Sequence, residues 1–392
     1  MKNQKRKIPK IRFNNFKAFW VEKRIADIVK ISAGGDVDKV KLKESGKYPV
    51  VANALTNKGI VGFYDDYKVK APAVTVTGRG DVGYAVARHE NFTPIVRLLT
   101  LQSENIDVDY LENQINSMRI LNESTGVPQL TAPQLGNYKV YHPEIEEQSA
   151  IGSLFRTLDD LLASYKDNLA NYQSLKAIML SKMFPKAGQT VPEIRLDGFE
   201  GEWEVQTLKE LASFSKGNGY TKNDLVNSGK EIILYGRLYT NYQTVISKVN
   251  TFVTTVKANT VISKGGEVIV PSSGESAEDI SRASVVEKSG IILGGDLNII
   301  YPDRNKVNSI FLALTISNGS QQKELIKRAQ GKSVVHLRNN DLEKVVLNYP
   351  SIEEQQAISS YFSNFDNLIN SHQEKISQLE TLKKKILQNM FI

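Results

Sequence analysis

The sequence predicts an α+β protein in which two globular domains with short twisted sheets are separated by two long helices. The helices are expected to form an antiparallel coiled coil, and the halves to be related as a tandem repeat with pseudo-two-fold symmetry. Residues 145–162 read IEEQSAIGSLFRTLDDLL, and residues 352–369 read IEEQQAISSYFSNFDNLI at a constant offset without a gap. A second repeat opens each half, PKIRFNNFKAFW at 9–20 and PEIRLDGFEGEW at 192–203. Short β-branched and aromatic runs lie between them, as in strands.

Each copy of the longer repeat is a helix by its period. Apolar residues step by threes and fours, which is the 3.5-residue spacing of a coiled coil. The predicted seam residues are Leu154, Leu158 and Leu161 in the first copy, and Phe365, Leu368, Leu379 and Leu382 in the second. A second apolar column, which includes Phe155 and Phe362, widens the stripe, so that each helix can contact more than one neighbour. The alternative is a surface helix packed on its own domain, but a heptad sustained in two matched copies argues against it.

The two helices are long enough to act as a spacer. At ~1.5 Å per residue, about 40 residues make a helix of roughly 60 Å. If the helices pair antiparallel, they would carry the two globular domains to opposite ends.

The composition is that of an ordinary globular protein, with 41% apolar and 24% charged residues among 392. The chain contains no cysteine, which excludes disulfides and thiolate metal sites and favours a cytoplasmic location. No apolar run approaches the ~18 residues of a membrane span. The basic N-terminus lacks the apolar segment of a signal peptide.

The formal net charge of +7 suits a polyanionic partner. Residues 1–24 carry nine basic side chains and one acidic one. Lysine and arginine neutralise phosphates and release counterions. For residues 1–7 a disordered solubilising tail is an equally good interpretation.

The first half divides into a basic tail (1–17), a globular domain (18–143) and the first long helix (144–185). Strands are expected at 48–51, 60–64, 73–77 and 83–86, and a helix at 109–122, from β-branched runs and helical period respectively. The helix breakers Pro185, Gly188 and Pro192 mark a linker at 186–200.

The second half repeats this plan with a globular domain (201–350) and the second long helix (351–392). Its strands are expected at 231–235, 260–262, 268–270 and 298–301, and its helices at 310–315 and 322–328. Between the flanking repeats the two globular segments barely align. Divergent interiors inside repeated frames indicate two domains of one type with different tasks.

The PEIRLDGFEGEW motif, its copy at 9–20 and the two IEEQ helices resemble the specificity subunit of type I restriction–modification enzymes. The resemblance covers nearly the whole chain. It implies two target-recognition domains, 18–143 and 201–350, each reading one half of a split DNA site. The paired helices would set the gap between the half-sites and dock methyltransferase subunits. Because the domains differ in sequence, the half-sites should differ too.

The resemblance also implies partners: double-stranded DNA, two methyltransferase (modification) subunits and restriction/translocase subunits, without a membrane. S-adenosylmethionine, ATP and Mg are expected on those subunits, and no cofactor on this chain, which would not itself be an enzyme. The residues agree, because the chain has no nucleotide-binding G-x-G-x-x-G or G-x-x-x-x-G-K-[ST] motif. Its four histidines lack metal-ligand spacing.

Candidate DNA-reading residues lie on loops that combine basic, amide, hydroxyl or aromatic groups with permissive glycines. They are Asn53, Lys58, Thr77 and Arg79 in the first domain, and Lys216, Tyr220, Arg237, Tyr239, Ser272 and Ser273 in the second. The segment 271–274 is expected to take the place of the Thr77 loop, because each follows a comparable strand. Any of these loops could instead be an ordinary surface turn.

Two other functions remain open. A coiled-coil scaffold whose globular heads bind proteins would show no salt-sensitive affinity for DNA. A lone enzyme would show activity in the purified chain.

Overall fold

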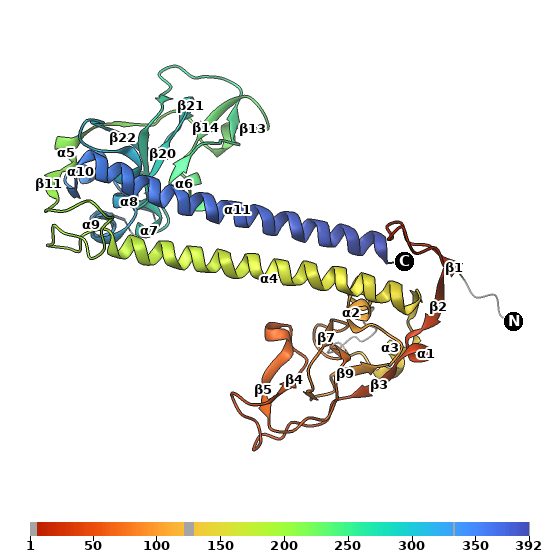
Figure 1. Cartoon of the computed structure of the whole chain (residues 1–392). Helices are drawn as coiled ribbons and strands as arrows, with labels where there is room; N and C mark the ends of the chain where they lie inside the picture. The colour runs from red at the N-terminus through yellow and green to blue at the C-terminus, as the bar shows by residue number, and fades with distance from the viewer. Residues whose placement is uncertain (1–5, 121–128, 332–333, 392) are drawn as a thin grey trace. The chain divides into compact units, whose positions relative to one another are not determined.

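The computed structural model describes residues 6–120, 129–331 and 334–391. It divides into two compact units, one of residues Met1–Asn168 with His372–Ile392 and the other of Leu169–Ser371. We call them unit 1 and unit 2. Each long helix contributes one stretch to each unit (Figure 1).

The described residues of unit 1 form three small sheets. The first has the order β1-β2-β10, the second β3-β9-β6-β7 and the third β5-β4-β8. The strands are β1 (Arg6–Lys7), β2 (Trp20–Arg24), β3 (Lys30–Ala33), β4 (Tyr48–Val51), β5 (Ile60–Tyr64), β6 (Ala73–Val76), β7 (Ala85–Arg88), β8 (Thr93–Pro94), β9 (Leu99–Gln102) and β10 (Lys139–His142). The helices are α1 (Ile25–Ile28), η1 (Thr56–Gly59), α2 (Val108–Ser117) and α3 (Ala132–Asn137).

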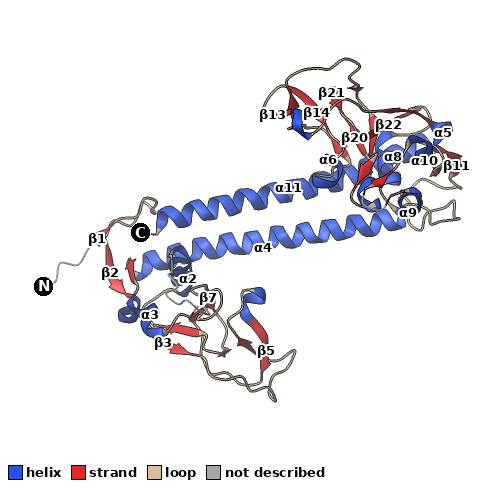
Figure 2. Ribbon diagram, turned by 180° about the vertical axis from the view of Figure 1, so that it is seen from behind, coloured by secondary structure: helices blue, strands red, loops and turns tan. Residues whose placement is uncertain are grey.

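Unit 2 repeats this plan with additional strands (Figure 2). Its two five-stranded sheets have the orders β12-β22-β18-β20-β15 and β13-β16-β14-β21-β17, and two-stranded sheets join β11 to β24 and β19 to β23. The strands are β11 (Glu204–Thr207), β12 (Ala212–Lys216), β13 (Leu225–Val226), β14 (Lys230–Ile233), β15 (Val245–Ile246), β16 (Phe252–Val253), β17 (Ile262–Lys264), β18 (Glu267–Pro271), β19 (Ser273–Gly274), β20 (Ser284–Val286), β21 (Ser289–Leu293), β22 (Leu297–Pro302), β23 (Val335–His336) and β24 (Val346–Tyr349). The short helices are α5 (Leu208–Leu211), η2 (Lys222–Asp224), α6 (Arg237–Thr240), α7 (Ala277–Ile280), α8 (Ser309–Ile316), α9 (Gly319–Arg328) and α10 (Asn339–Leu342).

The strand predictions are confirmed, with small shifts at the ends. β7 begins at Ala85, two residues later than expected, and β17 begins at Ile262. Helix α2 ends at Ser117, since Met118 is already extended. Residues 121–122, the last of that expected helix, lie outside the described part of the chain.

The two units share strand register where their sequences do not match. β3 pairs with β9 and β12 pairs with β22, both antiparallel, and β6 and β18 continue the two sheets in the same order. β4 lies parallel to β8, and β14 lies parallel to β21. The doubled frame therefore extends through the interior of both domains, and positions in one can be matched to positions in the other by hydrogen bonding.

The long helices, α4 (Ile145–Lys182) and α11 (Ile352–Met390), pack antiparallel within each unit. In unit 1, Lys166 pairs with Glu380 at 2.7 Å, and Lys383 pairs with Asp159. In unit 2, Lys176 pairs with Asp366, which occupies the position of Asp159 in the repeat. The same interhelical ion pair is thus made twice.

The apolar stripe of these helices is only partly covered. Of the predicted seam, Leu158, Phe365 and Leu379 are buried and Leu154 is partly buried. Leu161, Leu368 and Leu382 are 40%, 41% and 46% exposed. The second apolar column is more completely buried, with Phe155 and Phe362 at 0%.

The PxIR and IEEQ motifs meet in a buried ion pair. Arg12 contacts both carboxylate oxygens of Glu147 at 2.7 Å, and Arg195 contacts those of Glu354 at 2.8 and 2.7 Å. Such a bidentate geometry is one that arginine makes and lysine cannot. The repeated motifs therefore join the segment that precedes each domain to the first turn of the following long helix.

The C-terminal end of each long helix fills an aromatic pocket. Phe184 packs against Trp203, Phe311 and Phe362 in unit 2, with ring centroids 5.6–6.1 Å apart. In unit 1 the matching residue, Phe391, packs against Trp20, Tyr110 and Phe155. In these matching Met-Phe pairs Met183, Phe184 and Met390 are buried, and Phe391 is partly buried against the core.

In the part of the chain that the structure describes, no helix is long and apolar enough to cross a membrane. The same residues contain no group of His, Asp or Glu side chains that could hold a metal ion.

Candidate nucleic-acid interface

Three loops of unit 1 meet beside Asn53. One follows β4, the second joins β6 to β7, and the third joins β8 to β9. The Asn53 amide donates to the carbonyl of Val96 at 2.6 Å, and its oxygen accepts from the backbone N–H of Gly78 at 2.7 Å. Asn53, which the sequence suggested as a DNA-reading residue, is therefore used to hold the loops together.

Two buried side chains brace these loops. Arg88, which is 7% exposed, donates to the Lys58 carbonyl at 2.6 Å and to the Thr75 hydroxyl at 3.0 Å. Burial lowers the pKa of Arg88 to about 10. The Thr77 hydroxyl donates to the Asp81 carbonyl and accepts from the Tyr84 N–H at 2.9 Å, so that it closes the β6–β7 loop from inside.

Three cationic side chains are exposed on these loops: Lys58, Arg79 and Arg97. Among the described residues none of the three forms an ion pair. Lys58 and Arg97 adopt left-handed backbone conformations, with φ of 49° and 61°. This conformation is uncommon for residues other than glycine, and the surrounding hydrogen bonds hold it. The loops of unit 1 therefore present a positive surface that suits phosphates and guanine edges.

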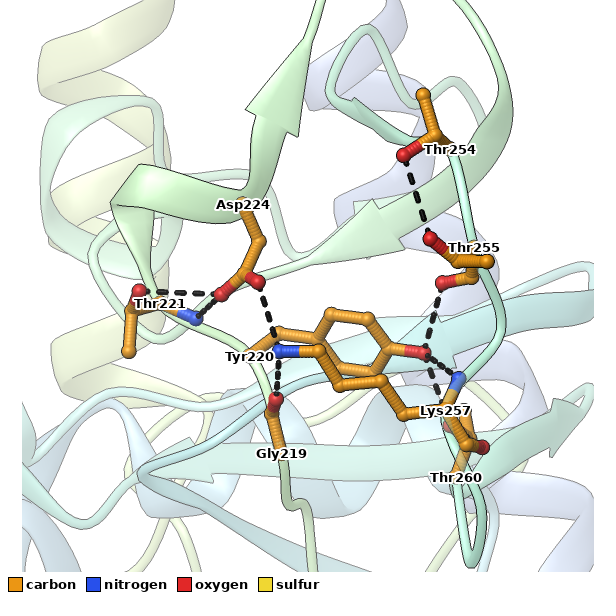
Figure 3. A network of polar contacts seen from close by, with 8 residues as sticks. All are labelled: Gly219, Tyr220, Thr221, Asp224, Thr254, Thr255, Lys257 and Thr260. Carbon is orange, nitrogen blue, oxygen red and sulfur yellow. Dashed lines mark hydrogen bonds and ion pairs between the residues drawn. The ribbon is translucent and has the colours of Figure 1, made fainter.

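In unit 2 a polar network around Tyr220 holds two loops together (Figure 3). The Tyr220 hydroxyl accepts from the Lys257 backbone N–H at 2.7 Å, donates to the Thr255 carbonyl at 3.2 Å and lies 2.9 Å from the Thr260 hydroxyl. The Lys257 ammonium lies 4.7 Å from the Tyr220 ring centroid and donates to Asp224 and to the Gly219 carbonyl, both at 2.7 Å.

The hydrogen bonds of that network stabilise the ionised carboxylate of Asp224. The hydrogen bond from Lys257, followed by that from the Thr221 backbone, lowers the pKa of Asp224 to about 2. Tyr220 is only 4% exposed. Its role is to fix the loop at 217–221 against the loop at 254–260.

The other predicted residues of unit 2 divide by exposure. Arg237 donates to Gln243 at 2.8 Å and to the Lys248 carbonyl at 2.9 Å, and burial lowers its pKa. Ser272 and Ser273 are each 7% exposed, and Ser273 pairs with His336 between β19 and β23. Tyr239 is half-buried, whereas Lys216 is exposed at the end of β12.

The segment 271–274 does hold the structural place of the Thr77 loop. Arg79 forms an isolated bridge with Gln129, and Ser273 pairs with His336, each within three residues of the end of the matching strand. The sequence missed Arg97, since it stands in the apolar stretch TPIVRLL. Asp296 was not among the predicted residues either, although it directly follows two glycines, Gly294 and Gly295. Contact of any of these residues with DNA stays a prediction.

Comparison with known proteins agrees with this two-domain arrangement. Residues 18–172 and 200–381 match the family described as Type I restriction modification DNA specificity domain. The chain is 22% identical over 277 residues to the Type I restriction enzyme MjaVIII specificity subunit of Methanocaldococcus jannaschii, which covers 68% of this chain and 64% of that relative. It is 26% identical over 164 residues to a putative type I specificity subunit, S.MpnORF507P, of Mycoplasma pneumoniae, covering 41% of this chain and 44% of that one. The chain thus matches less than two thirds of the length of either relative.

Two solved structures share the fold. A type I restriction–modification system S subunit from M. genitalium superposes with a TM-score of 0.69 at 16% identity, covering 98% of this chain and 99% of that one. A chain from a study of complex assembly and conformational transition of the type I R-M system gives a TM-score of 0.51 at 15% identity, covering 94% and 96%. With both globular domains inside the matched residues, this chain belongs to the family of type I restriction–modification DNA specificity domains.

Proposed function

We propose that this chain is the DNA-specificity subunit of a type I restriction–modification complex, in which each target-recognition domain reads one half of a bipartite site. The observation that carries the proposal is that both domains have the same pairing of central strands, whereas the loops that join these strands differ in sequence. The loops of unit 1 expose the cations Lys58, Arg79 and Arg97. The matching loops of unit 2 differ in chemistry: Asp296 is exposed there, and Ser272 and Ser273 are buried. Two readers with different chemistry fit two half-sites of different sequence.

The long helices would set the gap between the half-sites. The repeated ion pairs Asp159–Lys383 and Asp366–Lys176 support a fixed antiparallel register in each unit. If one helix shifted along the other, the partners in both ion pairs would move apart. Bases between the half-sites would then lie where neither domain reads them.

The exposed leucines support docking of two copies of one partner. Leu161 and Leu382 in unit 1 match Leu368 and Leu175 in unit 2 by the repeat, and all four are 40–46% exposed. Equivalent apolar patches on equivalent helices fit identical subunits better than unlike ones. We assign them to methyltransferase subunits, which would supply S-adenosylmethionine chemistry. Restriction subunits would supply the ATP- and Mg-dependent steps.

Binding by the assembled complex tests the proposal. The complex of this chain with its methyltransferase subunits should protect a site with two separated half-sites, and its affinity should fall steeply with salt. A specific site should be preferred to unrelated DNA by ~10³-fold or more. Equal affinity for all duplexes in the assembled complex would contradict it, whereas the lack of any salt-sensitive affinity for DNA would favour the scaffold function.

A further inference from the structure

We infer that one structurally equivalent turn in each domain carries a base-reading side chain of opposite charge: Arg97 for guanine in domain 18–143, and Asp296 for cytosine in domain 201–350. This inference rests on the proposed function and deepens it. It names two specificity residues and the base class that each one takes.

Hydrogen bonding establishes that the two positions are equivalent. The N–H of Gly34 donates to the Leu98 carbonyl at 2.8 Å, and the N–H of Gly217 donates to the Leu297 carbonyl at 2.9 Å. Arg97 and Asp296 each directly precede those leucines.

The residues before the turn match as well. The N–H of Ile95 donates to Val51, and that of Gly294 donates to Ile233, both at 2.9 Å. Both turns therefore follow the strand that lies parallel to β4 or β14 and lead into β9 or β22.

Both side chains are presented outward by an unusual backbone. Arg97 has φ of 61° and Asp296 has φ of 58°. In domain 18–143 the preceding Val96 is left-handed too, with φ of 51°, which is a conformational outlier for a β-branched residue. Both charged residues are exposed, and among the described residues neither side chain makes a hydrogen bond or an ion pair.

Hydrogen bonds and close backbone contacts hold both turns in place, as base reading requires. In domain 18–143, Asn53 fixes the Val96 carbonyl, and the Gly78 Cα lies so close that a Cβ there would be 3.1 Å from the Arg97 carbonyl oxygen. In domain 201–350, the Asp296 carbonyl accepts from the Ser272 N–H at 2.8 Å. A Cβ on Gly217 would lie 2.0 Å from the Gly294 oxygen, so two backbones touch beside the turn.

The Tyr220 network holds the same region from the other side. A Cβ added to Gly295 would lie 3.1 Å from the Tyr220 carbonyl oxygen (Figure 3 shows that residue). The loop that Tyr220 and Lys257 hold in place therefore packs against the turn that carries Asp296.

The chemistry of each group selects its base. A guanidinium donates two parallel hydrogen bonds, which match the O6 and N7 acceptors of guanine in the major groove. A carboxylate only accepts, so phosphates repel it and it needs a base edge that donates. Cytosine offers its N4 amino group, whereas adenine places the N7 acceptor beside its amino group, where a carboxylate is disfavoured.

Methylation-motif mapping in cells that carry the complete system tests Arg97. Arg97→Ala should degrade discrimination at one guanine of one half-site by about 10- to 100-fold and leave the other half-site unchanged. Arg97→Lys keeps the charge but lacks the fork, so it should also lose discrimination while retaining overall DNA affinity. Lys30→Ala is the matched control, because Lys30 is an exposed cation at the opposite end of β3.

The outcomes separate base reading from phosphate binding. An unchanged motif in Arg97→Ala, or a uniform loss of affinity with a smaller salt dependence that Arg97→Lys restores, would overturn the assignment. Absence of any bipartite motif in the wild-type system would instead contradict the proposed function. Unaltered melting temperatures of the variants exclude misfolding as the cause.

Substitution of Asp296 should change which base is preferred at one position, rather than abolish the discrimination between bases there. Asp296→Asn should shift one position of the other half-site from cytosine toward adenine, because an amide pairs with adenine N6 and N7. Glu287→Gln is the control, since Glu287 is an exposed acid in the turn between β20 and β21, whereas Asp296 follows the other end of β21. A motif identical to wild type in Asp296→Asn, or a change in both half-sites, would contradict the inference.

Discussion

At the scale of single residues, the arginines of the repeated motifs act inside the protein. Glu147 and Glu354 are each 2% exposed in their ion pairs with Arg12 and Arg195. The two sites differ in one respect. Trp20 Nε1 also donates to Glu147, at 3.1 Å, whereas Trp203 Nε1 is buried without a partner among the described residues.

Arg195→Ala should therefore be costly, because it leaves Glu354 buried beside no cation. Loss of one partner of a buried ion pair costs about 3–5 kcal/mol. Arg12→Ala should cost less, since Trp20 still donates to Glu147. Urea unfolding of the purified variants measures both, and an Arg195→Ala/Glu354→Gln variant should regain part of the loss. A cost under about 1 kcal/mol for Arg195→Ala, as for a surface pair, would contradict this explanation.

Glu112 should make unit 1 less stable as the pH rises. Burial, then the charge of Asp159, raises the pKa of Glu112 to about 7 from 4.5. Between these values the unfolded chain releases the proton and the folded chain keeps it, so the free energy of unfolding falls across that window and is constant above it. The total is about 3 kcal/mol at most.

Glu112→Gln removes that titration. The variant should match the wild type near pH 4 and exceed it in stability near pH 8. Chemical unfolding at the two pH values gives the difference, and a difference independent of pH would show that Glu112 does not titrate in this way.

At the scale of elements, the ends of the long helices are core residues. Phe184 is 6% exposed among three aromatic rings. Phe184→Ala should reduce the free energy of unfolding by about 3–5 kcal/mol. Leu175→Ala is the control on α4, the helix that ends just before Phe184, because Leu175 is 43% exposed and its loss should change stability by less than about 0.5 kcal/mol in the isolated chain. Equal effects of the two variants in thermal or urea unfolding would be inconsistent with this packing.

The sequence was a good guide to elements, whereas the burial of the candidate DNA-reading residues depends on tertiary packing that it does not reveal. The period of α4 and α11 and the β-branched runs of β4, β5 and β18 are local signals, so they could be read directly. The exposure of Leu161 could not be predicted in this way, because a wide apolar stripe does not show which of its columns packs against the neighbouring helix. Tyr220 and Ser272 combine suitable chemistry with glycine-rich surroundings, yet tertiary packing buries them. The structural equivalence of Arg97 and Asp296 depends on strand register, and the register cannot be deduced from two segments whose sequences do not align.

At the scale of the whole molecule, the helical spacer should determine the unread gap in the site. Seven residues added after Asn168 and seven after Lys375, matching positions of the repeat, would lengthen each helix by about 10 Å and keep its apolar period. At about 10 base pairs per 34 Å, the gap should grow by about 3 base pairs. Motif mapping would show this, and an unchanged gap with both half-sites retained would mean that another feature sets the distance.

The most direct test of two independent readers is an exchange of one domain. Residues 18–143 would be replaced by the corresponding segment of another member of the family, and the modified sites would be mapped in cells with the complete system. If each domain reads its own half-site, one half-site should have a new sequence, with the other half-site and the gap unchanged. A change in both half-sites, or in neither, would contradict it.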